Sequence, residues 1–263
     1  MKPMVPDAVY ILNRRPYKES SLLLDIFSYH HGRQSILAQG ALKSKKGWAA
    51  LLQVFQPLIM TWTGRSSLKT LVSLEAPSPA IMLQNERLYS GYYLNELLLK
   101  LISVSIESQS RESSYPGSHQ AIFLAYADAL GGLQDDENIE VPLRKFEFAL
   151  LEDLGIFPDF HQDISGKNID AEVYYQLKLQ QGFCAVLADR GSHDQLSPFI
   201  KGEFIMHIQN NLDNLSALAM DQQKEGLRQL KKLMRVLIDD ALDGKEIKSR
   251  SLFHRYQPKR SIT

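Results

Sequence analysis

The first third of the chain alternates short apolar runs with turn residues, a pattern typical of β-strands. Five such runs are present, at residues 7–12, 20–27, 34–39, 58–63 and 68–75. The stretch Arg14-Arg15-Pro16-Tyr17 breaks the first run, because proline interrupts regular structure. A short helix-like segment, residues 48–55, lies between the third and fourth runs. This order predicts a five-stranded OB-fold barrel.

After Pro77-Ser78-Pro79 the apolar residues recur at helical spacing. Four helices are expected, at residues 86–104, 118–133, 142–154 and 225–242. The segment between residues 156 and 200 is irregular, with two possible short strands at 174–179 and 183–187. We therefore predict an α+β chain with an OB-fold domain at 1–79, a helical domain at 80–243 and a basic C-terminal tail at 244–263.

Composition narrows the class of protein. Hydrophobic residues make up 44% of the chain, which is enough for a proper core. The single cysteine, Cys184, excludes an internal disulfide framework and any multi-cysteine zinc site. No apolar run has membrane-spanning length, and the N-terminus does not have the pattern of a signal peptide. These features favour a cytoplasmic protein.

Charge is distributed unevenly along a chain with no formal net charge. Residues 1–70 hold ten Lys and Arg against three Asp and Glu, a net charge of +7. Residues 244–263 hold six against one, a net charge of +5, so residues 71–243 carry −12. Basic ends beside an acidic middle favour a polyanionic partner for the basic segments, and nucleic acid is our first choice.

Sequence motifs of enzymes are absent. The chain has no GxxxxGK[ST] phosphate loop, no GxSxG elbow and no HExxH pair. This favours a binding protein over an enzyme, and we expect no cofactor. Two alternatives stay open. The basic barrel can serve as a scaffold that docks an acidic protein, or acids such as Asp25 and Glu19 can serve a metal-dependent nuclease.

Five stretches in this order resemble the RecO family of bacterial recombination mediators: RPYKESSLLLDIFSYHHGRQSILAQGALKSKK, LKTLVSLEA, RLYSGYYLNELLLKLI, LRKFEFALLEDLG and GKEIKSRSLF. The resemblance implies an N-terminal OB-fold, a helical second domain and a role in DNA repair. It also implies binding of single- and double-stranded DNA, annealing of complementary strands and a nucleoid-associated location. The implied partners are RecR, with which the family loads RecA, and the acidic C-terminal tail of the single-strand-binding protein.

One departure from the family concerns metal. Many RecO proteins carry a four-cysteine zinc site in the second domain, whereas the corresponding region here, about residues 156–190, offers only Cys184. The chain therefore resembles the zinc-free branch of the family. We expect no metal and expect packing to take the metal's place, with Cys184 as a small core residue.

The segment GALKSKKGW, residues 40–48, is the first candidate for contact with DNA. Lysines in a loop that leaves the third strand reach phosphates as mobile point charges, without reading sequence. Other cations extend the same face, and the tail contributes two more, although helix capping and packing are equally good explanations for the tail. The predicted DNA-binding residues are Lys43, Lys45, Lys46, Arg14, Arg15, Arg33, Arg65, Lys69, Trp48, Lys248 and Arg250.

Aromatic residues are possible stacking platforms for bases. For Trp48 stacking and packing are equally weighted, and for Tyr17 and Tyr29 packing is favoured. A second site is predicted for the acidic partner tail, which needs an apolar slot beside positive charge at a helix start. Its residues are Arg144, Lys145, Phe146, Leu150, Leu151, Leu124 and Leu130.

Overall fold

The computed structural model describes residues 5–45, 47–64, 66–103, 118–135, 138–186, 199–210 and 223–255. The chain separates into two units, one formed by residues 1–139 with 246–263 and the other by residues 140–245. The predicted boundary at residue 79 lies inside the first unit, and the predicted domain limits stay a prediction. No helix in the described ranges is long and apolar enough to cross a membrane.

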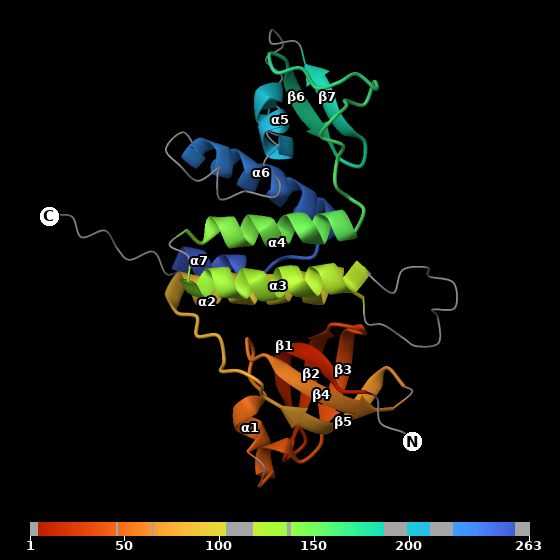
Figure 1. Cartoon of the computed structure of the whole chain (residues 1–263), viewed down its shortest axis with the longest axis vertical. Coiled ribbons are helices and arrows are strands. Elements are labelled where there is room, and N and C mark those ends of the chain that lie inside the picture. The colour runs from red at the N-terminus through yellow and green to blue at the C-terminus, as the bar shows by residue number, and fades with distance from the viewer. Residues whose placement is uncertain are drawn as a thin grey trace, which may run out of the picture. The chain divides into compact units, whose positions relative to one another are not determined.

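A closed five-stranded barrel forms the N-terminal part of the first unit (Figure 1). Its strands are β1 (Asp7–Tyr17), β2 (Ser21–Ser28), β3 (Gly32–Ala38), β4 (Leu58–Thr63) and β5 (Leu68–Glu75). They run in the order β1-β2-β3-β5-β4, and pairing of β1 with β4 closes the barrel. All pairs are antiparallel except β3 with β5, which is parallel. The predicted OB-fold is confirmed.

The predicted break at Pro16 is wrong. Strand β1 continues to Tyr17, with Pro16 opposite Leu22 of β2. Strand β1 pairs with β4 only through residues 7–9 and has a bulge after Ile11, so Pro16 faces no β4 partner on its second edge. Because such an edge needs no N–H donor, proline is tolerated there.

Alternate residues of the five strands fill the barrel interior. The fully buried side chains include Ile11, Leu24, Ile26, Ile36, Met60 and Trp62. One end is covered by the connection between β3 and β4, which holds the 3-10 turn η1 (Ala41–Lys43) and the short helix α1 (Trp48–Leu51). Trp48, Leu51 and Val54 of this connection pack against the barrel core. The helix expected at 48–55 is thus present but ends at Leu51.

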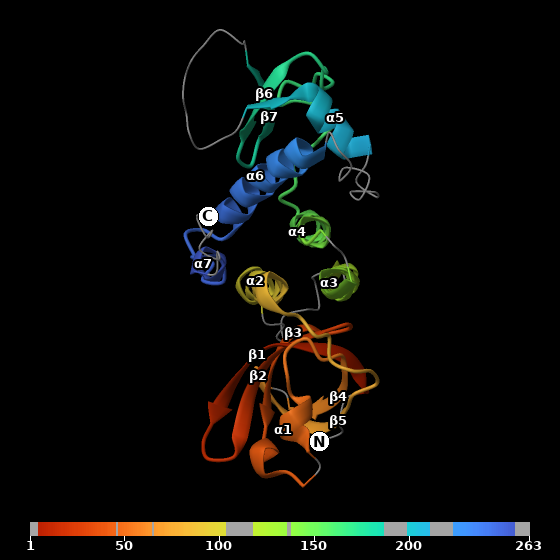
Figure 2. The same cartoon turned by 90° about the vertical axis from the view of Figure 1, so that its left-hand side faces the viewer.

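Within its described residues, the first unit also contains the helices α2 (Asn85–Leu101), α3 (Ser118–Asp135) and α7 (Arg250–Arg255). Helices α2 and α3 lie side by side on the barrel end that is opposite α1 (Figure 2). The buried side-chain amide of Asn95 donates to the main-chain oxygen of Leu12 at 2.9 Å, and the Tyr126 hydroxyl donates to Asn95 Oδ1. Burial raises the pKa of Tyr126 well above its ordinary 10.0, so the hydroxyl stays a donor.

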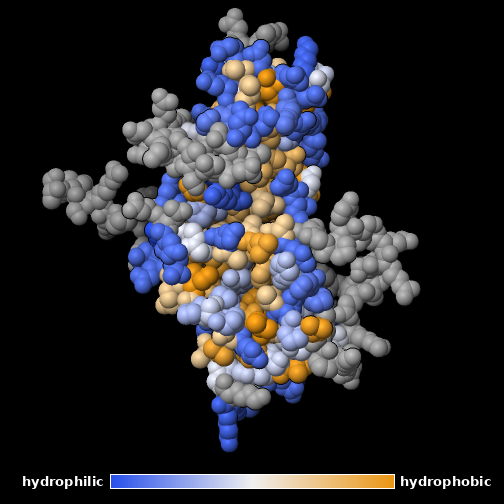
Figure 3. All heavy atoms as spheres, in the orientation of Figure 1, coloured by the Kyte–Doolittle hydropathy of each residue, from blue (hydrophilic) through white to orange (hydrophobic). Residues whose placement is uncertain are grey.

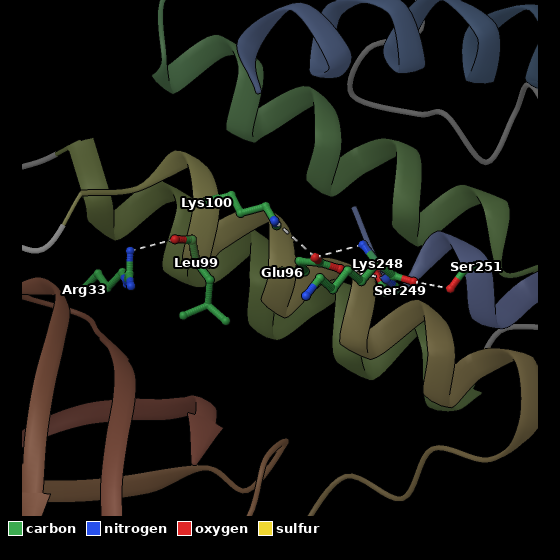
Figure 4. Close-up of polar contacts among 7 residues, drawn as sticks. All are labelled: Arg33, Glu96, Leu99, Lys100, Lys248, Ser249 and Ser251. Carbon is green, nitrogen blue, oxygen red and sulfur yellow. Dashed lines mark hydrogen bonds and ion pairs between the residues drawn. The ribbon is translucent and has the colours of Figure 1, made fainter. Parts of the chain in front are cut away.

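The barrel and the chain's last helix are both tied to α2 (Figure 4). Arg33 of β3 donates through Nη1 to the main-chain oxygens of Leu99 and Ile102, at 2.7 and 3.0 Å. These oxygens end α2, where a cation is stabilised by the helix dipole. Glu96 of α2 accepts hydrogen bonds from the segment that begins α7, at Lys248 and Ser249. Helix α2 is therefore the common support of the first unit.

The second unit contains α4 (Glu140–Asp153), β6 (Tyr174–Lys178), β7 (Gly182–Val186), β8 (Phe199–Lys201), α5 (Gly202–Asn210) and α6 (Gln223–Ala241). The three strands form an antiparallel sheet in the order β7-β6-β8. Helices α4 and α6 pack against each other, and Lys231 of α6 binds Glu140 of α4 at 2.6 Å. The four predicted helices and two short strands are confirmed within a few residues at their ends, whereas β8, α5 and α7 were not predicted.

Candidate nucleic-acid interface

Three cations lie at the exposed end of the β1–β2 hairpin. Arg14 and Arg15 stand on the last part of β1, and Lys18 forms the turn with φ 53. The guanidinium of Arg14 donates to the main-chain oxygen of Leu52 at 3.0 Å, which positions it beside the end of α1. The Lys18 ammonium lies 5.5 Å from the centroid of the Tyr17 ring. Lys18 was missed in the sequence, although it adjoins two predicted cations in one hairpin.

The connection from β3 to β4 brings further lysines to the same place. Gly40 has φ 67, a left-handed conformation that turns the chain sharply after β3. The N–H of Leu42 then donates to the main-chain oxygen of Ser20 at 2.9 Å, which joins this connection to the hairpin turn. As a result Lys43 Nζ lies 4.0 Å from the Glu19 carboxylate, and both side chains are highly exposed. Such an exposed ion pair contributes little, so Lys43 remains accessible.

We call this group the hairpin-end cluster. It consists of Arg14, Arg15, Lys18, Lys43 and Lys45, all of them exposed. Hydrophilic residues project from this end of the barrel in the surface view (Figure 3). Glu19 is the acid within these two loops, so a net positive charge faces the solvent there. A surface of mobile cations neutralises phosphates without reading bases. Lys46 lies outside the described residues.

Two predicted cations occupy structural positions instead. Lys69 is only 2% exposed, and its ammonium donates to the main-chain oxygen of Gly64 at 3.4 Å. Arg33 is half-buried. Its Nη1 donates to main-chain oxygens at the end of α2, and its Nη2 lies 3.8 Å from the carboxylate of Asp25. A side chain held in this way does not reach a phosphate at the surface, so we do not assign either residue to the interface. Arg65 lies outside the described part of the chain.

The three candidate aromatic residues differ in exposure. Trp48 is half-buried and packs against the barrel core. Tyr29 is half-buried, and its ring centroid lies 5.5 Å from that of Phe123. Tyr17 is 38% exposed at the hairpin end, beside Lys18. Of the three rings, that of Tyr17 is therefore the most exposed. The rings of Trp48 and Tyr29 pack against other residues, as the packing alternative expects.

Comparison with known proteins decides the family. Residues 1–79 match the family Recombination protein O N terminal, and residues 82–251 match Recombination protein O C terminal. The chain is 38% identical over 245 residues to DNA repair protein RecO of Aliivibrio fischeri (strain MJ11), covering 93% of each chain. This chain belongs to the RecO family.

Further RecO proteins show the same extent of similarity. The protein of that name from Haemophilus influenzae (strain PittGG) is 37% identical over 246 residues, which is 93% of each chain. The one from Marinobacter nauticus is 37% identical over 256 residues, which is 96% of this chain and 95% of the relative. The chain is thus a DNA repair protein of the RecO family, and the resemblance noted in the sequence is confirmed.

The tail residues of this RecO chain are anchored at α2. Glu96 accepts from the N–H groups of Lys248 and Ser249, at 2.9 and 2.8 Å, and from the Ser249 hydroxyl at 2.8 Å. Burial alone would raise the pKa of Glu96, but these hydrogen bonds and the nearby Lys100 ammonium outweigh it and lower the pKa. The Lys248 side chain is exposed, and the Arg250 guanidinium lies 5.7 Å from the Tyr93 ring centroid. Lys248 is accessible to DNA, whereas Arg250 has a packing role.

The residues predicted to bind the partner tail lie mostly in the interior. Arg144 of α4 is 4% exposed, and its Nη1 lies 2.9 Å from the carboxylate of Glu147, which is itself buried. Phe146, Leu150 and Leu151 are fully buried. Of the α4 residues in this prediction, only Lys145 reaches the surface.

The two α3 residues of the same prediction also differ. Leu130 is fully buried, whereas Leu124 is 53% exposed. The apolar residues at 130, 146, 150 and 151 thus serve the cores of their units and offer no open slot. Helical spacing alone does not distinguish a core stripe from a binding groove, which is why the sequence led to them.

Cys184 lies half-buried in β7, opposite Gln176 of β6. Within the described ranges, no three or more His, Cys, Asp or Glu side chains are grouped so as to hold a metal ion. Asp25, one acid of the nuclease alternative, is buried and accepts from Asn13 and Ser35, while Glu19 is exposed.

Proposed function

We propose that this chain is a recombination mediator that binds single- and double-stranded DNA without sequence specificity and anneals complementary strands. In this proposal it acts with RecR to load RecA onto DNA coated by the single-strand-binding protein. Membership of the RecO family supports a role in DNA repair. The finer activity is supported by one structural observation, the hairpin-end cluster of exposed cations, which come from the end of β1 and from two loops of an OB-fold barrel.

The chemistry of the cluster suits sequence-independent binding. Its three lysines lie in the loops and its two arginines near the end of β1, and lysine contacts phosphate as a point charge without fixed geometry. Annealing requires no covalent step. Two strands repel each other until cations neutralise their phosphates, and weak stacking then releases the bases for pairing. Exposed Tyr17 next to Lys18 offers one small stacking surface of this kind.

The test is the anisotropy of a labelled single-stranded oligonucleotide of mixed sequence, titrated at several salt concentrations. The variant is Lys43→Gln/Lys45→Gln, which removes two exposed cations of the cluster. The matched control is Lys167→Gln/Lys178→Gln, which removes two exposed cations of the second unit and leaves the barrel untouched. Both double variants lower the net charge by two, so a difference in DNA affinity between them reflects where the cations lie and not the overall charge.

We expect wild type to bind with a steep salt dependence, because each neutralised phosphate adds about 0.7 to the slope of log affinity against log salt for a single strand. The cluster variant should lose affinity and up to about 1.4 of that slope, and it should anneal complementary strands more slowly. The control should match wild type. Equal behaviour of the two variants would remove the cluster from the interface.

The scaffold alternative makes a different prediction in the same assay. If the basic barrel docks an acidic protein, wild type should show no salt-dependent affinity for the oligonucleotide at low salt. The cluster variant should then lose a protein partner rather than DNA. Capture of RecR by wild type and by the cluster variant tests this alternative, because RecR is one of the two proposed protein partners.

Binding of the acidic tail of the single-strand-binding protein stays a separate proposal. Among the α4 residues predicted for it, Lys145 is the exposed cation, so Lys145→Gln is the variant to use. Arg144→Ala would break a buried ion pair and destabilise the fold, so a loss of peptide binding in that variant would not report on the site itself. Unchanged affinity of Lys145→Gln for a synthetic tail peptide would exclude α4 from this site.

A further inference from the structure

Helix α1 (Trp48–Leu51) forms a small cover on one end of the barrel (Figure 1). It has only four residues, and none of them is fully buried. Trp48 and Leu51 pack against the barrel core from outside. A single helical turn is not stable by itself, because nucleating a helix costs more than one turn returns. The position of this α1 cover therefore depends on its contacts with the rest of the barrel.

The backbone on both sides of the α1 cover leaves the helical conformation. Gly47, at its N-cap, has φ 68, a left-handed conformation that glycine adopts without strain, and no side chain caps the helix there. Leu52, at its C-cap, has φ −77 and ψ 61. The chain thus changes direction immediately before and after the turn. Such a segment can loosen without disturbing the strands on either side of it.

Arg14 of the hairpin-end cluster holds the end of the α1 cover. Its Nη1 donates to the main-chain oxygen of Leu52 at 3.0 Å. Leu52 is fully buried, so water does not readily replace the guanidinium at this oxygen. A buried acceptor that loses its donor is unfavourable, and here the loss destabilises the turn that Leu52 ends. The contact with Arg14 therefore stabilises the α1 cover in the position that the structure shows.

Arg14 is also an exposed member of the surface that we propose for DNA. The oxygen of Leu52 is a neutral acceptor, whereas a phosphate oxygen is charged. Hydrogen bonds to a charged acceptor are about twice as strong as neutral ones, and a guanidinium binds phosphate through two parallel N–H groups. A phosphate beside Arg14 therefore competes with Leu52 for the same donors and binds them more strongly.

Trp48 is the aromatic ring that this competition affects. The N–H of Leu52 donates to the main-chain oxygen of Trp48 at 2.9 Å, so one helical turn joins the ring to the residue that Arg14 contacts. Trp48 is half-buried in the free chain. Indole offers a large stacking surface, and stacking tolerates any sequence because every base has a π face. Lys43 and Lys45, which precede α1, bring a bound strand to the same place.

We propose that DNA opens the α1 cover: a phosphate withdraws Arg14 from Leu52, α1 loosens, and Trp48 becomes able to stack on a base. Arg14 is then a positioning residue for Trp48. This inference rests on the proposed function, because the ligand is the DNA assigned to the hairpin-end cluster. It makes binding a two-step process, in which charge holds the strand first and stacking follows only at a bound phosphate.

The experiment uses the full chain and the variant Arg14→Gln. Its matched control is Arg15→Gln, which removes the same charge from the next residue of β1. Arg15 is also exposed, but successive residues of a strand point to opposite faces, so Arg15 points away from Leu52. The first measurement is hydrogen exchange of the Ala50 and Leu52 amides, which donate to Gly47 at 3.1 Å and to Trp48 at 2.9 Å. Thermal melts confirm that the variants fold.

The second measurement is tryptophan emission. The chain has two tryptophans, and Trp62 is fully buried in the barrel core. Trp48→Phe leaves Trp62 alone and so shows how much of any change in emission comes from Trp48. The probes are a single-stranded oligonucleotide of mixed sequence and an abasic strand of equal length. The abasic strand supplies the same phosphates without bases, so the pair separates release of α1 from stacking.

Without DNA, the two amides should exchange about fivefold faster in Arg14→Gln than in Arg15→Gln. That ratio corresponds to about 1 kcal/mol, since 1.4 kcal/mol is a factor of ten, and it matches one hydrogen bond. In wild type, saturation with either strand should accelerate exchange of these amides to a similar extent. The strand with bases should also quench the emission of Trp48, whereas the abasic strand should not.

Three results would overturn the inference. Equal exchange in Arg14→Gln and Arg15→Gln would show that Arg14 does not hold α1. Exchange in wild type that stays the same or slows on saturation with the oligonucleotide would show that DNA does not open the cover. Unchanged emission of Trp48 with the strand that carries bases would show that Trp48 is not the ring that DNA uncovers.

The proposed function and this inference fail in different ways. If anisotropy shows no salt-dependent affinity of wild type for the oligonucleotide, both are wrong. If wild type binds and Lys43→Gln/Lys45→Gln weakens binding, while exchange of the Ala50 and Leu52 amides in wild type does not respond to DNA, only the opening of the α1 cover is excluded.

Discussion

Removal of the Glu96 carboxylate should release the segment that carries the tail cation Lys248. Glu96 accepts from the N–H groups of Lys248 and Ser249 and from the Ser249 hydroxyl, all at 2.8 to 2.9 Å, and Lys100 Nζ lies 3.4 Å away. Ser249 is only 5% exposed, so water cannot readily replace the lost acceptor at its N–H and hydroxyl. Figure 4 shows these contacts around one carboxylate.

The magnitude follows from the hydrogen bonds. A bond to a charged group contributes about 1.5–3 kcal/mol, and a buried donor left without an acceptor costs about 1–3 kcal/mol. Because Lys248 is exposed, we count only the two bonds of Ser249 and expect Glu96→Ala to lower the free energy of unfolding by about 3 kcal/mol, the lower end for two such bonds. Glu96→Gln keeps one acceptor oxygen and should cost about 1 kcal/mol.

The pH dependence has a definite sign. The hydrogen bonds lower the pKa of Glu96 below its ordinary value of 4.5, so the unfolded chain binds this proton more readily. The contribution of the charge is therefore fully present above about pH 4.5 and is lost as the pH falls through the lowered pKa of the folded state. The difference between wild type and Glu96→Gln should shrink over that acid range.

Hydrogen exchange of the Lys248 and Ser249 amides is the most direct measurement, combined with urea denaturation. Glu75→Gln is the control, since Glu75 is an exposed acid on β5. The amides should exchange faster in Glu96→Ala and at the wild-type rate in the control. Unchanged protection of both amides in Glu96→Ala would refute the reasoning. A loss of stability below about 0.5 kcal/mol would also refute it, because one hydrogen bond to a charged group contributes more than that.

Three further substitutions, one of them with a control, test the interior. Arg144→Ala removes the guanidinium 2.9 Å from the buried carboxylate of Glu147 and should cost about 3–5 kcal/mol in urea denaturation. Gly91→Ala places a Cβ within 2.8 Å of two side chains and should cost about 1–3 kcal/mol in thermal melts, whereas Gly131→Ala meets nothing within 4 Å and should be neutral or stabilising. Asn95→Leu removes two buried hydrogen bonds and should cost about 2 kcal/mol, measured by urea denaturation.

The strand pattern predicted the barrel because the strands are short apolar runs, and turn glycines such as Gly40 and Gly64 follow two of them. The same rules misjudged Pro16, since they treat proline as a break without regard to which strand edge it occupies. Pro16 lies where β1 has a partner on one side only, and that depends on where β4 ends its pairing. Edge and interior positions are properties of the closed barrel and are not visible in the local sequence.

Cations were harder to place than strands. Lys69 shares a strand face with Leu71, two residues on, and Leu71 points into the core, so alternation along β5 could have revealed that Lys69 is buried. Arg33 gave no such signal, because its partners are main-chain oxygens of α2 about 66 residues later. Lys43 and Lys45 were placed correctly at the surface, since they follow a turn glycine outside any strand.

The region expected to replace a metal by packing is held by aromatic rings. Phe157 lies 4.0 Å from Phe148 and 4.9 Å from Phe160, whose ring centroid is 5.3 Å from that of Phe183. Three such ring pairs contribute about 2–4 kcal/mol beyond burial, well below the roughly 10–16 kcal/mol of a structural zinc. Burial of Phe160 and Phe183 adds about 2–3 kcal/mol each, so the total contribution of the rings still stays below that of a structural zinc. We therefore expect this part of the second unit to unfold locally more readily than the same region held by a metal. Local unfolding should begin around Phe148 and Phe157, which are only half-buried.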